Sequence, residues 1–160
     1  MRSPKNILLL MLSVCIMFTA SCKKEPAPNP PFDHQIDPFT IVPTNELMGC
    51  RWVYEKKIVV DDKSVQMSDT ALRRETLIFT SDSTAMYYND YYAARSEDDV
   101  HRTGKCTYEF DGTYGDITLT EKYDNGYNNT LNGWFMYDKG ILTWEKSVSD
   151  MDSPKVFTRR

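Results

Sequence analysis

The 160-residue sequence has few of the side chains on which most catalytic centres depend. It contains two histidines, His34 and His101, and no Gly-x-Ser-x-Gly segment of the kind that presents a serine nucleophile. No C-x₂-C pair with the usual zinc spacing is present. The acidic segment Glu97-Asp98-Asp99 lacks the spacing of a calcium loop. We therefore expect no enzymatic activity, no bound metal and no cofactor.

The chain also lacks an apolar run as long as the about 20 residues that a membrane-spanning helix requires. Its longest apolar run, Ile7 to Phe18, is broken by Ser13. Arg2 and Lys5 precede this run, and small residues follow it. This order of a positive start, a short apolar stretch and small residues is typical of an export signal.

Thr19-Ala20-Ser21-Cys22 resembles the lipobox of bacterial lipoproteins, in which the cysteine receives a diacylglycerol before cleavage. The resemblance implies a signal peptide over residues 1–21 and acyl chains such as palmitate on Cys22. Several chains would hold the protein on a membrane, because each buried methylene contributes about 0.8 kcal/mol. Lys23 follows the cysteine, where Asp would favour the inner membrane, so we expect the outer membrane, on its periplasmic or its surface face. The alternative is an ordinary secretory signal that happens to end at a cysteine.

A proline-rich tether is predicted between the lipidated cysteine and a single folded domain, over residues 22–45, with the domain at 46–160. Such a segment favours extended conformers of about 3 Å per residue and acts as a spacer. Phe32, Ile36 and Phe39 could instead pack against the domain. Six of the eight prolines lie here: Pro26, Pro28, Pro30, Pro31, Pro38 and Pro43.

The charge of the chain after signal removal is mildly acidic. Residues 1–21 contain two basic and no acidic residues, so 17 basic and 23 acidic residues remain, a formal net charge of −6. A nucleic-acid-binding surface would need a clustered basic patch. We therefore exclude nucleic acid as a partner and expect the membrane, a small apolar ligand or an envelope protein.

Two cysteines remain beyond the signal and the lipidation site, Cys50 and Cys106. An exported compartment permits a disulfide between them. The alternative is two buried free thiols, which pack well as small apolar groups. The sequence leaves both alternatives open.

From Glu46 onward, apolar and polar residues alternate as they do in half-buried strands. The clearest case is the stretch in which Cys106, Tyr108 and Phe110 alternate with Thr107 and Glu109. We predict eight strands, at Cys50–Glu55, Glu75–Thr80, Thr84–Tyr92, Cys106–Asp111, Asp116–Tyr123, Leu131–Tyr137, Ile141–Lys146 and Lys155–Arg160. Short strands at regular spacing indicate a sandwich or a barrel.

The connections between these strands differ in how clearly they are marked. Asp124-Asn125-Gly126 and Asp138-Lys139-Gly140 place residues that tolerate positive φ where hairpins reverse. Asp61–Leu72 and Ala93–Val100 have no clear period, and we predict longer loops or a helical turn there.

Leu47-Met48-Gly49-Cys50-Arg51-Trp52 resembles the opening of a calycin barrel, in which a glycine and a tryptophan begin the first strand. The chain as a whole, ending in Phe157-Thr158-Arg159-Arg160, resembles small lipocalin-like lipoproteins of Bacteroides-type bacteria. The resemblance covers Leu47 to Arg160 and implies an all-β, eight-stranded, up-and-down antiparallel barrel. It also implies that Arg159 packs over Trp52, a contact of about 0.5–2 kcal/mol. The alternative is a core tryptophan with two solvated arginines.

An eight-stranded barrel is either filled by its own side chains or holds one small ligand. Large aromatic residues at inward positions favour a solid core. A residual apolar cavity at one mouth is the alternative, and the same residues would then line it. The inward positions predicted by alternation are Trp52, Tyr54, Phe79, Tyr108, Phe110, Leu119, Phe135 and Trp144.

A tyrosine-rich run is the most distinctive local feature. Alternation places Tyr87 and Tyr91 on one face of a strand and Tyr88 and Tyr92 on the other, so we expect at most one pair in the core. The other pair would bind a protein or a sugar, or would stabilise the sheet through cross-strand pairing.

Asp69-Thr70-Ala71 and Asp82-Ser83-Thr84 resemble the short acceptor pattern of O-glycosylation in Bacteroides-type bacteria. Thr70, in a predicted loop, is the better candidate and Ser83 the second.

Anchor, tether and barrel together predict a membrane-anchored lipoprotein that serves as a small-molecule-binding or accessory module. The alternative is a protein-interaction or inhibitor module with a filled interior, acting through surface loops such as Ala93–Val100.

Overall fold

The computed structural model describes residues 36–62, 67–93, 98–123, 126–146 and 154–160. The predicted signal peptide, the lipidation site Cys22 and the tether up to residue 35 lie outside these ranges. Within them, no helix is long and apolar enough to cross a membrane.

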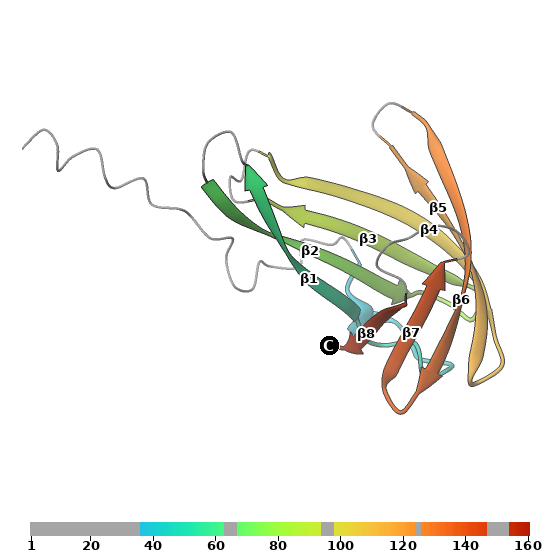
Figure 1. Cartoon of the computed structure of the whole chain (residues 1–160). Coiled ribbons are helices and arrows are strands. Elements are labelled where there is room, and N and C mark those ends of the chain that lie inside the picture. The colour runs from blue at the N-terminus through green and yellow to red at the C-terminus, as the bar shows by residue number, and fades with distance from the viewer. Residues whose placement is uncertain (1–35, 63–66, 94–97, 124–125, 147–153) are drawn as a thin grey trace, which may run out of the picture.

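The described residues form a short 3₁₀ turn, η1 (Pro38–Thr40), followed by eight antiparallel strands. Each strand pairs with the next, and β8 pairs with β1, so the sheet closes into a barrel (Figure 1). The predicted all-β, up-and-down barrel is confirmed, and a two-layered sandwich is excluded. The strands are β1 (Trp52–Asp62), β2 (Met67–Phe79), β3 (Thr84–Tyr92), β4 (Val100–Phe110), β5 (Tyr114–Lys122), β6 (Asn128–Asp138), β7 (Ile141–Lys146) and β8 (Lys155–Arg159).

The prediction of a loop or helical turn over Asp61–Leu72 is wrong. There β1 and β2 continue as a long hairpin whose register runs to Asp62 opposite Met67. Charged residues interrupt the apolar alternation in this stretch, but the backbone ladder does not depend on side-chain polarity, because its hydrogen bonds join main-chain groups. Likewise β4 begins at Val100, six residues before the predicted start at Cys106.

Strand register divides the side chains into an inward and an outward set, because successive residues point to opposite faces. All eight residues predicted to face inward do so. Six of them are buried, while Tyr54 and Phe110 are half-buried and pack against the core. The core also contains Leu77, Ala85, Tyr87, Cys106, Ile117, Leu142 and Phe157.

One end of the barrel is closed by the segment that precedes β1. Leu47, Met48 and Cys50 are buried in the core cluster, and Met48 forms a parallel bridge to Phe79. The indole Nε1 of Trp52 donates a hydrogen bond of 2.8 Å to the carbonyl oxygen of Leu47. We call this group the closed end; backbone hydrogen bonds between Arg51 and the terminal Arg160 complete it.

Gly115 allows the aromatic core to approach the backbone of β5. A Cβ atom at this position would lie 2.2 Å from Cζ of Phe135 and 2.6 Å from the carbonyl oxygen of Glu109. The Phe135 ring occupies this space and stacks against Phe110, with the ring centroids 5.7 Å apart. Interiors are close-packed, so this side of the barrel is solid at its centre.

Part of the outer face of β1 to β3 is buried, although Val59 on the same face is 64% exposed. Val53, Ile78 and Tyr88 point outward in the register and are nevertheless buried. The tyrosine run therefore contributes one buried residue from each face, Tyr87 inside and Tyr88 outside. Of the four tyrosines, Tyr87 alone belongs to the core cluster, in line with the expectation of at most one pair in the core. Alternation shows which way a side chain points, but it cannot show whether the outer face of a sheet is covered.

Candidate functional site at the open end of the barrel

The second end of the barrel differs from the first because the strands have unequal lengths. β7 has 6 residues and β8 has 5, whereas β1 has 11 and β2 has 13. In the described register, β8 meets β1 at Trp52 and Val53, so most of β1 extends beyond it. Figure 1 shows the long strands β1 to β4 side by side, with the short β8 beside the start of β1 and the short β7 next to it.

A cavity of about 420 Å³ lies against the inner wall of β1 to β4 at this end. Its lining is made by inward positions that are neighbours in the register: Arg73 opposite Tyr91, Tyr91 opposite Val100, and Asn89 opposite Arg102. We call it the mouth cavity. It combines two guanidinium groups, an amide and a phenol with two aliphatic side chains, and its lining residues are Ile58, Arg73, Asn89, Tyr91, Val100 and Arg102.

A buried ion-pair network lies next to the mouth cavity. The carboxylate of Glu75 is fully buried, and its Oε1 contacts Nζ of Lys155 at 2.7 Å and Nη2 of Arg73 at 2.8 Å. The hydroxyl of Tyr87 donates a hydrogen bond of 2.7 Å to Oε2. Burial, followed by the negative charge of Glu75, raises the pKa of Tyr87 well above its usual range, so the hydroxyl remains a donor.

This network links β2 and β8 on the inner wall of the barrel, and Arg73 belongs both to it and to the lining of the mouth cavity. Lys155 comes from β8 and Glu75 from β2, the two strands that flank β1, so their contact spans β1 on the inner face of the barrel. Two cations share one carboxylate, which leaves the network with a formal charge of +1. Buried charges of this kind persist when their hydrogen bonds are satisfied by neighbours.

Arg102 has a different environment from Arg73. Its guanidinium carbon lies 4.9 Å from the ring centroid of Tyr123, which supports it from one side. Among the described residues, no carboxylate forms an ion pair with Arg102, and its side chain is exposed at the cavity. The guanidinium N–H groups of Arg102 can therefore donate hydrogen bonds to a ligand in the cavity.

The charges on the inner face near the mouth are unbalanced. Among side chains that the structure describes, four cationic and two anionic groups occupy inward positions here. The excess of two positive charges contrasts with the formal net charge of −6 of the chain beyond the signal. The cations are Lys56, Arg73, Arg102 and Lys155, and the anions are Glu75 and Glu121.

Comparisons with protein-family models, curated proteins and solved structures find no match to this chain. The eight predicted ligand-lining residues form the packed core, and the mouth cavity is lined by six others. Sequence reasoning left four of the six, Ile58, Arg73, Val100 and Arg102, outside its strands, because it ended each of these strands where apolar residues ended. It included Asn89 and Tyr91 in a strand but did not assign them to a cavity. The available signal was the continuation of the alternation upstream of Cys106, through Val100, Arg102 and Gly104.

The predicted stacking of Arg159 on Trp52 is not formed. The two residues are opposite each other in the β1–β8 register. However, Trp52 packs edge-on against Tyr137, with the centroids 5.9 Å apart, and Arg159 lies near the Cys50 thiol instead. The carbonyl oxygen of Leu47 and the ring of Tyr137 already occupy the surroundings of the indole.

Cys50 and Cys106 are both buried and are not joined in a disulfide. Of the two alternatives, the structure has free thiols. Desolvation by burial raises the pKa of Cys50, and the nearby Arg159 opposes this rise. The thiols therefore pack as small apolar groups.

The two candidate glycosylation positions lie in different environments. Thr70 is in β2 opposite Val59 and is half-buried, so the loop predicted around it is wrong. Ser83 is exposed in the turn between β2 and β3. Accessibility therefore favours Ser83 over Thr70.

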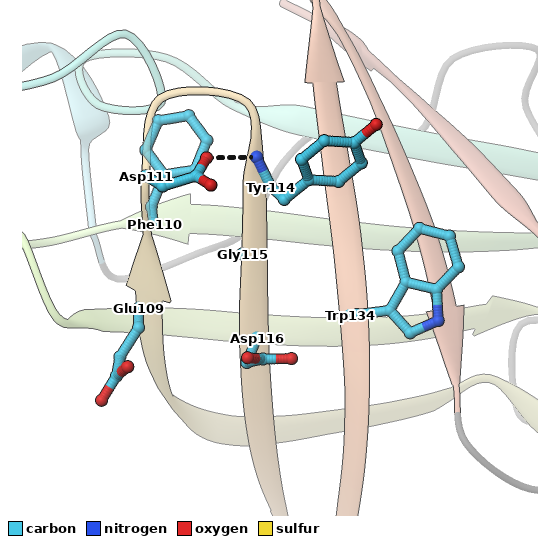
Figure 2. A pocket seen from close by; sticks show the side chains of 7 residues that line it. All are labelled: Glu109, Phe110, Asp111, Tyr114, Gly115, Asp116 and Trp134. Carbon is cyan, nitrogen blue, oxygen red and sulfur yellow. Dashed lines mark hydrogen bonds between the residues drawn. The ribbon is translucent and has the colours of Figure 1, made fainter.

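A second concave surface, the outer groove, lies on the outside of β4 to β6 and has a volume of about 480 Å³. The exposed rings of Tyr114 and Trp134 lie on one side of it in Figure 2, with Glu109 and Asp111 on the other. Glu109 and Asp116 are directly opposite in the register, an arrangement of like charges that costs stability. Hydrogen bonds from the backbone N–H groups of Tyr114 and Thr113 lower the pKa of Asp111.

Among the described residues, no group of three or more His, Cys, Asp or Glu side chains could hold a metal ion. The two concave surfaces therefore differ in chemistry: the mouth cavity is cationic and partly apolar, and the outer groove is acidic and aromatic.

Proposed function

We propose that this chain is a lipid-anchored binding module whose lipocalin-like barrel takes up one small molecule at its open end. The observation behind this proposal is the mouth cavity, whose about 420 Å³ falls within the range of known ligand pockets, about 300–1,000 Å³. A few polar groups converge there on an otherwise aliphatic and aromatic wall, which is the usual composition of such sites. The packed core beneath it supplies a rigid floor.

Binding can be tested with N-phenyl-1-naphthylamine, a neutral probe whose fluorescence rises in apolar surroundings. The described fold begins at Ile36, so a chain starting at Lys23 keeps every strand and every core residue. We expect saturable binding of one probe per chain. Val100→Trp fills part of the mouth cavity and should weaken binding about tenfold or more, because the indole occupies volume that the probe needs.

The matched control for this experiment is Val156→Trp, because Val156 is also an exposed strand valine but points outward from β8. It should leave the affinity unchanged. Equal effects of the two substitutions, or no saturable binding by the parent chain, would contradict the proposal.

The alternative function, a protein-interaction module, is supported by the outer groove. Exposed rings beside carboxylates suit a basic segment of a partner protein, through cation–π contacts and ion pairs. This alternative becomes the better account if the neutral probe does not bind at the mouth.

The anchor is a separate part of the proposal and has its own test. When the full chain is expressed in a Gram-negative host, we expect it in the detergent-rich phase of a Triton X-114 separation and in the outer-membrane fraction. Cys22→Ser should move it to the aqueous phase, because acyl chains provide the membrane affinity. A Cys22→Ser chain that remained in the detergent phase would contradict lipidation at this residue.

A further inference from the structure

We infer that the mouth cavity selects an organic anion with an apolar body, and that Arg102 is the residue that recognises its negative group. This inference rests on the proposed function, since it names the class of small molecule that the cavity takes. The apolar body would lie against Ile58, Val100 and the ring of Tyr91, which line the same cavity.

The first reason is the state of the two guanidinium groups. Arg73 is held by Glu75 at 2.8 Å, so part of its hydrogen-bonding capacity is already used. Arg102 forms no ion pair within the described residues and is positioned by the ring of Tyr123. A guanidinium stacked on an aromatic ring keeps its edge available for a planar or tetrahedral anion.

The second reason is the local sign of the charge. Near the cavity, the described inward side chains comprise four cations and two anions, whereas the chain beyond the signal has a formal net charge of −6. Charge inside a concave site with low-dielectric walls concentrates ions of the opposite sign there. An acidic exterior with a cationic mouth therefore favours anions specifically at the mouth.

Glu121 is the group that could oppose this effect, because it also points inward. It lies opposite Gly104, one inward position deeper than Arg102, and is buried. The hydroxyl of Tyr123 donates a hydrogen bond of 3.4 Å to its Oε2. Tyr123 thus contacts both residues. Glu121 does not line the cavity.

Two probes that share one ring system separate the anion from the apolar body. 8-Anilinonaphthalene-1-sulfonate carries a sulfonate, and N-phenyl-1-naphthylamine carries none. For the chain starting at Lys23, we expect the sulfonate to bind about tenfold more tightly, the effect of one charge-assisted contact. Raising the salt concentration should weaken sulfonate binding and leave the neutral probe unaffected.

Arg102→Gln should lower the affinity for the sulfonate about tenfold and leave the affinity for the neutral probe unchanged. Lys105→Gln is the matched control, because it removes one positive charge from the same strand at a position whose side chain points outward. It should change neither affinity. Near-ultraviolet circular dichroism and the thermal midpoint would verify that both variants keep the fold.

The outcomes distinguish the inference from the proposed function. If both probes bind equally well, or if Arg102→Gln changes both affinities or neither, the anion preference is overturned while a binding mouth remains. If the neutral probe binds and the sulfonate does not, the anion preference is likewise overturned while a binding mouth remains. If neither probe binds, the proposed function is overturned and the inference fails with it.

Discussion

Replacing Glu75 with glutamine should lower the free energy of unfolding by about 3–5 kcal/mol, the usual effect of removing one partner of a buried ion pair. The substitution keeps the shape of the side chain and an acceptor for the Tyr87 hydroxyl. It removes the negative charge that compensates Lys155, which is 1% exposed, and the neighbouring Arg73. Urea denaturation followed by circular dichroism would measure the change.

Two further variants make this result specific to the network. Glu109→Gln removes a carboxylate from an exposed position opposite Asp116, so it should be neutral or slightly stabilising. Adding Lys155→Met to Glu75→Gln should recover part of the loss, because the uncompensated ammonium is then gone; partners in contact are not additive. A Glu75→Gln chain as stable as the parent would show that the network contributes little.

Trp52→Ala should be the most destabilising substitution at the closed end, at about 3–5 kcal/mol. The indole is fully buried, packs edge-on against Tyr137 and donates a hydrogen bond to Leu47. Its removal combines the lost burial of a large ring with a cavity at the closed end and the loss of the hydrogen bond to the Leu47 carbonyl. The thermal midpoint and the urea midpoint should both fall.

Trp134→Ala is the control for this substitution, because the chain offers a second tryptophan on the outside of the barrel. Trp134 is 43% exposed, and its truncation should change stability by about 0.5 kcal/mol or less, as surface substitutions usually do. Similar losses of stability for the two variants would mean that the packing of Trp52 at the closed end does not stabilise the fold more than a surface tryptophan does.

The strand order and the core could be predicted from the sequence because both depend on a period of two. Cys106, Tyr108 and Phe110 alternate with polar residues, and a barrel that buries one face of each strand keeps this pattern. The turn at Asp138-Lys139-Gly140 was equally readable, since Lys139 and Gly140 both have positive φ in the structure.

The mouth cavity could not be predicted in the same way. Arg73 and Arg102 face inward but read in the sequence as ordinary solvated residues, because an open end tolerates charge that a core excludes. Which end is open depends on the difference in length between β8 and β1, and the pairing of these two strands is a contact between the first and the last strand of the barrel. The Arg159 interaction failed for a related reason: register gave its neighbour, Trp52, but not which side of the indole was already occupied.

The position of the closed end decides at which end of the barrel an anchor would be attached. The described chain enters the barrel through Leu47 and Met48, at the end opposite the mouth cavity. An anchor upstream of the described residues would therefore be attached at the closed end of the barrel, and the entering segment at Leu47 and Met48 leaves the mouth cavity free for a ligand.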